Sequence, residues 1–257
     1  LASDFRPSWP KRGTSVRSFI HFGVNVVGFD LAYYFHDNMD KILIGRVWGG
    51  HQLGLYSKAY SILMMPLSIL RYPLNRVAFP AMSRLKDDPV RFRSYFVKYC
   101  SVLAFASMPL VTILYLNAES IIKLILGDRW LGAVELFRIL AVAGFIQSVA
   151  SLRTTVIMSS GHGSRLSRWG FCNALASVAA FICGLPWGAK GVSIAYCIVS
   201  YMILHPSLMY AFRNTPVRTN DFYHSVSMPC AASIMMSILY ILTVEYMPEL
   251  PEIVLLI

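Results

Sequence analysis

Long apolar runs recur along the whole chain, and they constrain its fold more than any other feature of the sequence. A helix needs about 20 apolar residues to cross roughly 30 Å of hydrocarbon. Hydrophobic residues make up 56% of the sequence and charged residues only 14%, whereas a soluble domain carries about 25% charged residues. The sequence therefore predicts an all-α polytopic membrane protein. The complete apolar runs lie at residues 18–48, 55–79, 95–116, 134–158, 169–185, 192–212 and 222–246, and a further one starts near Pro251.

The first run is too long for one straight crossing and contains a polar cluster at residues 36–41. The cluster is either a loop or part of a long helix that reaches beyond the bilayer. We favour the long helix, because residues 42–48 are too few to cross alone and the glycines at 49–54 already supply a turn. Glycine and proline elsewhere in the runs fit both close helix packing and hinges for alternating access.

Basic residues fall in alternate loops, which predicts the orientation of the chain, because short cytoplasmic loops of membrane proteins are rich in Lys and Arg. The N-terminal segment and the loops at 83–93, 159–168 and 213–221 carry these residues, whereas the intervening loops are poor in them or balanced by acids. The basic loops should therefore face the cytoplasm, together with the N-terminal segment.

Charged residues inside the predicted spans are the candidates for a functional site, since each costs about 2.5–3.5 kcal/mol at the centre of a bilayer. Three of them, Arg46, Arg76 and Glu135, lie near helix ends, where a long side chain can reach the headgroups. Asp40 and Lys41 point about 100° apart on a helix, so each should have a partner elsewhere. The remaining four, which lie deeper and could equally face a cavity, are Asp30, Arg71, Arg138 and Arg153.

Several functional classes lack their signatures in this sequence. No phosphate-binding loop of the GxxxxGK[ST] kind and no HExxH zinc motif occurs, and the loops are too short for a catalytic domain. The five cysteines lie in apolar runs, where they serve packing rather than a disulfide framework or a metal site. We expect no catalytic residues, no metal, no cofactor and no nucleic-acid partner, and we expect the protein not to be an enzyme.

Three stretches of the sequence resemble bacterial polysaccharide transporters of the lipopolysaccharide and colanic-acid flippase branch. The first covers residues 38–96 and reads NMDKILIGRVWGGHQLGLYSKAYSILMMPLSILRYPLNRVAFP followed by AMSRLKDDPVRFRSYF. The others are LILGDRW at 124–130 and GLPWGAKGVSIAY at 184–196. Because the stretches are in register with the predicted spans, the resemblance extends over nearly the whole chain.

The resemblance implies the fold of the multidrug, oligosaccharidyl-lipid and polysaccharide exporters, in which two helical bundles carry two additional helices at the end. This chain would be the C-terminal bundle. Its expected parts are a cytoplasmic basic segment at 1–17, a bundle of about six spans at 18–212, and additional, truncated helices at 213–257. A missing N-terminal half of the same protein would be its main partner, and polysaccharide polymerase or ligase machinery is a further candidate.

The implied work is to move an undecaprenyl-pyrophosphate-linked oligosaccharide across the bacterial cytoplasmic membrane by alternating access, surrounded by membrane lipids. Buried cations suit the pyrophosphate, so the candidate cargo-binding residues are Lys41, Arg71, Arg138 and Arg153, and the candidate ion-coupling residues are Asp30 and Asp40. Two alternatives remain open. A cation-coupled multidrug exporter of the same superfamily would need acidic residues in its cavity, and a membrane-embedded polymerase or glycosyltransferase would need large loops with carboxylates.

Overall fold

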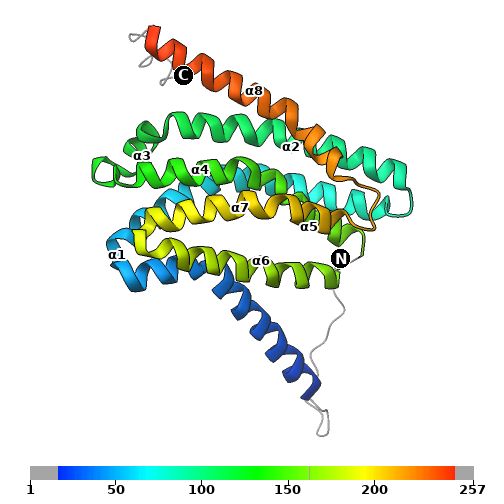
Figure 1. Cartoon of the computed structure of the whole chain (residues 1–257). Coiled ribbons are helices and arrows are strands. Elements are labelled where there is room, and N and C mark those ends of the chain that lie inside the picture. The colour runs from blue at the N-terminus through cyan, green and yellow to red at the C-terminus, as the bar shows by residue number, and fades with distance from the viewer. Residues whose placement is uncertain (1–16, 162, 247–257) are drawn as a thin grey trace, which may run out of the picture. The chain divides into compact units, whose positions relative to one another are not determined.

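The described part of the chain is helical and contains no strand (Figure 1). The computed structural model describes the backbone of residues 17–161 and 163–246, and the side chains of residues 38–161, 165, 166 and 168–244. It divides into two units at Met39, and the geometry below concerns the second unit, which begins at Asp40. The basic segment at residues 1–16 and the predicted eighth span near Pro251 lie outside the described residues.

The elements follow one another with short connections. They are α1 (Arg17–Arg84), α2 (Pro89–Leu116), α3 (Ala118–Leu126), η1 (Asp128–Trp130), α4 (Ala133–Ala150), α5 (Leu152–Ser159), α6 (Gly163–Gly184), η2 (Leu185–Trp187), α7 (Gly188–Phe212) and α8 (Thr219–Tyr246).

The long helix α1 consists of two arms that meet at Gly49, which has a φ of 79° and a ψ of −179°. The Tyr56 hydroxyl donates a hydrogen bond of 2.6 Å to Oδ2 of Asp40. In a straight helix these residues would lie about 24 Å apart along the axis, so the chain folds back at Gly49. The predicted first span therefore ends where the turn was expected, and the polar cluster is part of a helix at its described residues.

Five stretches of helix are long and apolar enough to cross a membrane: 38–84, 89–116, 133–159, 168–212 and 219–244. Two of them contain a reversal. The first folds back at Gly49, and the fourth contains the 3-10 turn η2 between α6 and α7, which ends at Gly188 with a φ of 72°. Divided at these turns, the stretches correspond to the apolar runs of the sequence, which confirms the predicted polytopic helical fold.

The three described basic loops meet at one end of the bundle. The Arg93 side chain at the start of α2 forms an ion pair with Asp221 at the start of α8. Nη1 of Arg165, which lies in the first turn of α6, donates a hydrogen bond of 2.6 Å to the carbonyl of Arg213, just after α7. These contacts tie the loops at 83–93, 159–168 and 213–221 together, as the predicted orientation requires.

The loops that are poor in basic residues meet at the opposite end. Nε1 of Trp48 donates to the carbonyl of Leu185 at 2.7 Å, and the backbone N–H of Ala189 donates to Oε1 of Gln52 at 2.9 Å. Lys190 and Glu135 form an ion pair of 2.5 Å at this end. The bundle therefore has one strongly basic end and one end where acids balance the bases, a polarity typical of a membrane protein with its basic end in the cytoplasm.

Helix α4 lies at the centre of the packing. Its buried residues contribute to both apolar clusters of the bundle, and together with α5 it is the most buried of the candidate spans. Gly144 allows the second arm of α1 to approach closely, since a Cβ there would lie 3.3 Å from Cδ2 of Leu63. Here the glycine serves close packing, one of the two roles that the sequence left open.

The first prediction concerns orientation. Single cysteines at Lys86 or Arg165 in a variant without native cysteines should resist a membrane-impermeant thiol reagent in intact cells. Cysteines at Gly50 or Arg129 should react, because the structure places these residues at the opposite end. Labelling is read by a mass shift before and after permeabilisation. Labelling of Lys86→Cys in intact cells, with Gly50→Cys protected, would reverse the orientation.

The second prediction concerns the hairpin of α6 and α7. A Cβ at Gly191 would lie 2.2 Å from the backbone oxygen of Gly184 and 2.6 Å from Cβ of Trp187. Gly191→Ala should therefore lower the free energy of unfolding by about 1–3 kcal/mol, the usual cost of overpacking. The control is Gly170→Ala in α6, where a Cβ would meet nothing within 4 Å. Monodispersity after heating in detergent measures both, and equal stability of the two variants would contradict the close contact.

Candidate functional site

A buried carboxylate lies where the two arms of α1 pack together. Asp40 is 7% exposed. Its Oδ2 accepts the hydrogen bond from the Tyr56 hydroxyl, and its Oδ1 accepts one of 2.8 Å from the backbone N–H of Lys41. The Lys41 side chain instead lies over the ring of Tyr60, with Nζ 5.5 Å from its centroid. Asp40 thus has the Tyr56 hydroxyl as a side-chain partner, and Lys41 has the ring of Tyr60.

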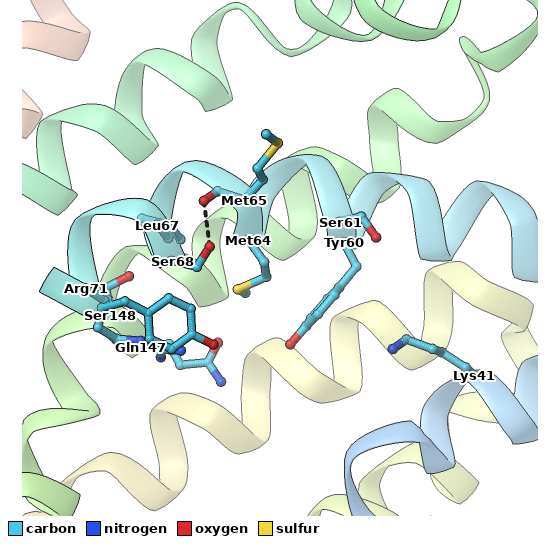
Figure 2. Close-up of a pocket in the computed structure, with 11 residues that line it drawn as sticks. Lys41, Tyr60, Ser61, Met64, Met65, Leu67, Ser68, Arg71, Gln147 and Ser148 are labelled. Atoms are coloured by element: carbon cyan, nitrogen blue, oxygen red, sulfur yellow. Dashed lines mark hydrogen bonds between the residues drawn. The ribbon is translucent and has the colours of Figure 1, made fainter. Parts of the chain in front are cut away.

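A pocket of about 410 Å³ opens beside this pair, within the apolar length of the bundle (Figure 2). Lys41 and Tyr60 lie at one part of it, and Arg71, Gln147 and Ser148 at another. Tyr60 and Arg71 are separated by about 16 Å of helix axis, so the pocket extends along the second arm of α1. Its volume falls within the range of small-molecule sites, about 300–1,000 Å³. We call it the Lys41–Arg71 pocket.

The Lys41–Arg71 pocket is basic. None of the described side chains that line it is acidic, and Arg71 forms no ion pair with an acidic residue in the described part of the chain. Tyrosine, serine and glutamine side chains complete its polar surface. Two cations with neutral hydrogen-bonding groups, held in a region of low dielectric, bind an anion more strongly than they would at an exposed surface.

A second, smaller cavity of about 60 Å³ lies between α4, α5, α6 and α7, and Arg153 lines it. Nη1 of Arg153 donates a hydrogen bond of 3.2 Å to Oγ of Ser207. Gln147 lines both this cavity and the Lys41–Arg71 pocket, and its Nε2 donates to the hydroxyl of Tyr196. The small cavity has room for about two waters, so Arg153 adjoins the larger pocket without lining it.

The other charged residues of the spans differ in their exposure and in whether they line a cavity. Arg138 is exposed on α4 and lines neither cavity, so the structure does not bring it together with Arg71 and Arg153. Arg46, Arg76 and Glu135 are exposed, which agrees with side chains that reach the headgroups. Asp30 lies in the helical part of α1 whose side chains are outside the described residues.

Three polar residues of this region were not among the sequence candidates: Tyr60, Gln147 and Tyr196. They carry no formal charge, so the search for charged residues passed over them. The sequence did contain a signal for Gln147, because burying an amide in an apolar run costs free energy unless the amide has a hydrogen-bond partner. No group of three His, Cys, Asp or Glu side chains placed to hold a metal occurs in the part of the chain that was described.

Comparisons with known proteins agree with this architecture. The family model described as polysaccharide biosynthesis protein matches residues 1–135. The teichuronic acid biosynthesis protein TuaB of Bacillus subtilis is 29% identical over 60% of this chain and 32% of its own length. The succinoglycan biosynthesis transport protein ExoT of Rhizobium meliloti is 23% identical over 88% of this chain and 46% of its own length.

A solved structure shares the fold. The lipid II flippase MurJ, in an inward closed conformation, superposes with a TM-score of 0.70 at 13% sequence identity, over 91% of this chain and 50% of that one. The chain thus spans about half the length, or less, of the proteins it matches. Since the family model covers more than half of the chain, the protein belongs to the polysaccharide biosynthesis protein family, and it is a multi-pass protein of the bacterial cytoplasmic membrane.

Proposed function

We propose that the chain is the C-terminal bundle of an exporter that moves an undecaprenyl-pyrophosphate-linked oligosaccharide across the cytoplasmic membrane, and that the Lys41–Arg71 pocket receives the pyrophosphate. The observation that carries the proposal is the presence of two cations, Lys41 and Arg71, in one pocket within the apolar length of the bundle. The family, a relative named as a transport protein, and the fold shared with a lipid II flippase support it.

The chemistry of the cargo explains why such a pocket is needed. A pyrophosphate carries several negative charges, and its passage through hydrocarbon requires groups that replace water. Arg71 can offer two parallel N–H donors to a pair of phosphate oxygens, and Lys41 can act as a compact point charge. Both residues are intermediate in exposure, neither buried nor fully exposed, so the cargo can reach them without unfolding of the helices.

Alternating access requires that the pocket change shape. Its wall is formed by both arms of α1 and by α4, and the arms are joined by Gly49, a residue whose positive φ an L side chain rarely adopts. A change of angle at this turn would move Lys41 relative to Arg71 and Gln147. In this proposal the rest of the exporter supplies a second bundle, and movement between the two bundles opens the pocket to either side of the membrane.

The two alternative functions fit the geometry less well. A cation-coupled drug exporter needs an acid in its binding cavity, but the buried Asp40 does not line the Lys41–Arg71 pocket. A polymerase or glycosyltransferase needs carboxylates in large loops, and the connections between the described helices are short. We therefore assign the protein a transport role rather than an enzymatic one.

Within the same proposal, Asp40 is the ion-coupling residue. Its carboxylate is buried and accepts hydrogen bonds from the Tyr56 hydroxyl and the Lys41 backbone N–H. Because Asp40 lies on the first arm of α1 and Tyr56 on the second, the hydrogen bond between them depends on how the two arms pack. Movement at Gly49 would change that packing together with the pocket.

The third prediction tests the cargo pocket. Arg71→Gln and Lys41→Gln keep hydrogen bonding but remove the charge, and a charge-assisted hydrogen bond is roughly twice as strong as a neutral one. Export in a flippase-deficient strain should fall about five- to ten-fold for each, at matched membrane abundance. Arg71→Lys should recover part of the loss, because it restores the charge without the bidentate geometry.

Arg138→Gln is the matched control, since it removes the same charge from a residue that lines neither cavity. Its export should be normal. Arg153→Gln should have an intermediate effect, because Arg153 lines the small cavity next to the pocket and not the pocket itself. Normal export in both Arg71→Gln and Lys41→Gln, or equal loss in Arg138→Gln, would refute the pocket assignment.

The fourth prediction tests Asp40. Asp40→Asn can still accept the hydrogen bond from Tyr56 but cannot carry a negative charge, so export should lose its dependence on the proton or sodium gradient. Tyr56→Phe, which removes the donor and leaves the carboxylate, should keep gradient dependence. Transport of labelled lipid-linked oligosaccharide in inverted vesicles with imposed gradients measures both. Unchanged gradient dependence in Asp40→Asn would exclude Asp40 as the coupling residue.

A further inference from the structure

A second basic site lies far from the cargo pocket, at the basic end of the bundle. A groove of about 650 Å³ runs between the starts of α2 and α8. We call it the α2–α8 groove. Its basic lining residues are Arg93, Lys98, Arg218 and His224, its acid is Asp221, and Val90 and Val97 contribute apolar surface. None of these residues lines the Lys41–Arg71 pocket.

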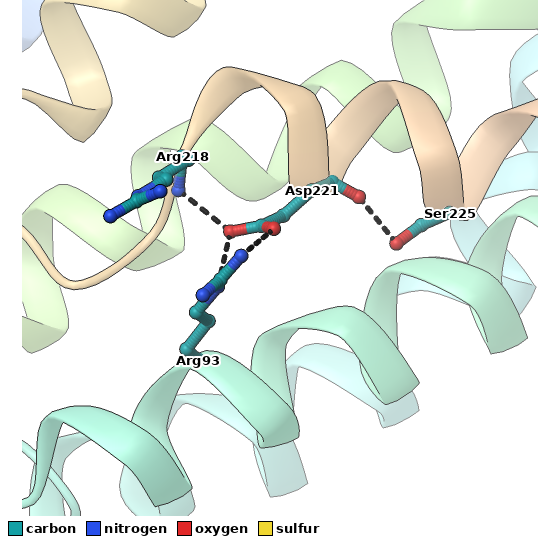
Figure 3. Close-up of polar contacts among 4 residues, drawn as sticks. All are labelled: Arg93, Arg218, Asp221 and Ser225. Atoms are coloured by element: carbon teal, nitrogen blue, oxygen red, sulfur yellow. Dashed lines mark hydrogen bonds and ion pairs between the residues drawn. The ribbon is translucent and has the colours of Figure 1, made fainter.

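Asp221, the single acid among the described residues that line the groove, already accepts hydrogen bonds at both carboxylate oxygens (Figure 3). Nε and Nη2 of Arg93 donate to its two carboxylate oxygens at 2.8 and 2.6 Å, and the backbone N–H of Arg218 donates to Oδ2 at 2.8 Å. Asp221 thus neutralises Arg93 and fixes the start of α8 against α2. The charges of Lys98 and Arg218 remain as an excess.

The two excess cations are positioned for a ligand outside the protein. In Figure 3 the Arg218 guanidinium points away from Asp221, while only its backbone reaches the carboxylate. Lys98 and Arg218 are both exposed, and neither forms an ion pair with an acidic residue in the described ranges. The groove therefore offers two flexible donors beside an ordered ion pair, and its net charge favours an anion.

Exposed apolar residues continue from the groove toward the middle of the membrane. On α2, Val102 and Phe105 follow Lys98 at helical spacing, and on α8, Met228 and Met235 follow His224. Val102, Phe105, Met228 and Met235 are 55%, 65%, 78% and 61% exposed. The site thus has a cationic part at headgroup level and an apolar track leading away from it, which is the shape of a phospholipid rather than of a soluble anion.

We propose that the α2–α8 groove binds an anionic phospholipid of the leaflet at the basic end, with its phosphate between Lys98 and Arg218 and its acyl chains along Val102, Phe105 and Met228. The bound lipid bridges α2 of the bundle and α8, and so stabilises the packing of α8 that the Arg93–Asp221 ion pair begins. This site is independent of the proposed cargo: a failure of the cargo assignment would leave it intact.

The fifth prediction follows. The complete exporter, purified and delipidated in a neutral detergent, should gain thermal stability when phosphatidylglycerol is added, and much less with phosphatidylcholine of the same chains. The Lys98→Gln/Arg218→Gln double variant should need about 30-fold more phosphatidylglycerol for the same gain, since each cation near a membrane surface contributes roughly five-fold to the affinity for anionic lipid.

The matched control is Arg84→Gln/Lys86→Gln, which removes the same two kinds of charge from exposed residues at the same end that do not line the groove. It should respond to phosphatidylglycerol as the unmodified protein does. Arg93 and Asp221 stay unchanged, so the ion pair is preserved, and equal melting of all variants without lipid confirms their folding.

Three outcomes would overturn the proposal. Equal sensitivity of both double variants would mean that phosphatidylglycerol acts through diffuse charge alone. Equal stabilisation by phosphatidylcholine would show that the apolar track, and not the cations, selects the lipid. Full stabilisation by glycerol phosphate or inorganic phosphate at millimolar concentration would make the groove a site for a soluble anion.

Discussion

The need to satisfy every backbone hydrogen bond without water is the constraint on which the rest of this structure depends. Hydrocarbon offers no partner for an open N–H or C=O, so a chain that crosses it must be helical along its whole depth. The described backbone obeys this rule, and its four glycines with positive φ, at positions 49, 127, 161 and 188, lie at the two ends of the bundle. The described chain therefore reverses its direction at the ends of the bundle, where water and lipid headgroups can complete the hydrogen bonding of the backbone.

The same lack of water determines where charged side chains can lie and which neighbours they need. Those near helix ends, such as Arg46 and Arg76, are exposed where headgroups can solvate them. Those deeper in the spans keep polar neighbours: Asp40 has Tyr56, and Arg153 has Ser207. Lys41 and Arg71 share a pocket whose described lining residues include no acid. If the pocket receives a negatively charged cargo, these two cations are the groups that would bind it.

Phosphate chemistry links the two proposed sites, but their surroundings differ. The Lys41–Arg71 pocket lies within the apolar length of the bundle, between the arms of a helix that reverses at Gly49. The α2–α8 groove lies at the basic end and leads onto exposed apolar helix faces. A charged group that crosses the membrane suits the first site, whereas a resident lipid with its phosphate at headgroup level suits the second.

The sequence by itself determined the helical class, the positions of the spans, the reversal near Gly49 and the alternation of basic loops, because the period of helices and the thickness of the bilayer act locally along the chain. Only the tertiary structure decided which charges meet. Arg71 and Arg138 looked alike in the sequence, yet the first lines a pocket with Lys41 and the second is exposed. Gln147 lines two cavities because α4 packs against both α1 and α7. Such neighbours depend on contacts between helices far apart in the chain, which hydrophobic periodicity does not encode.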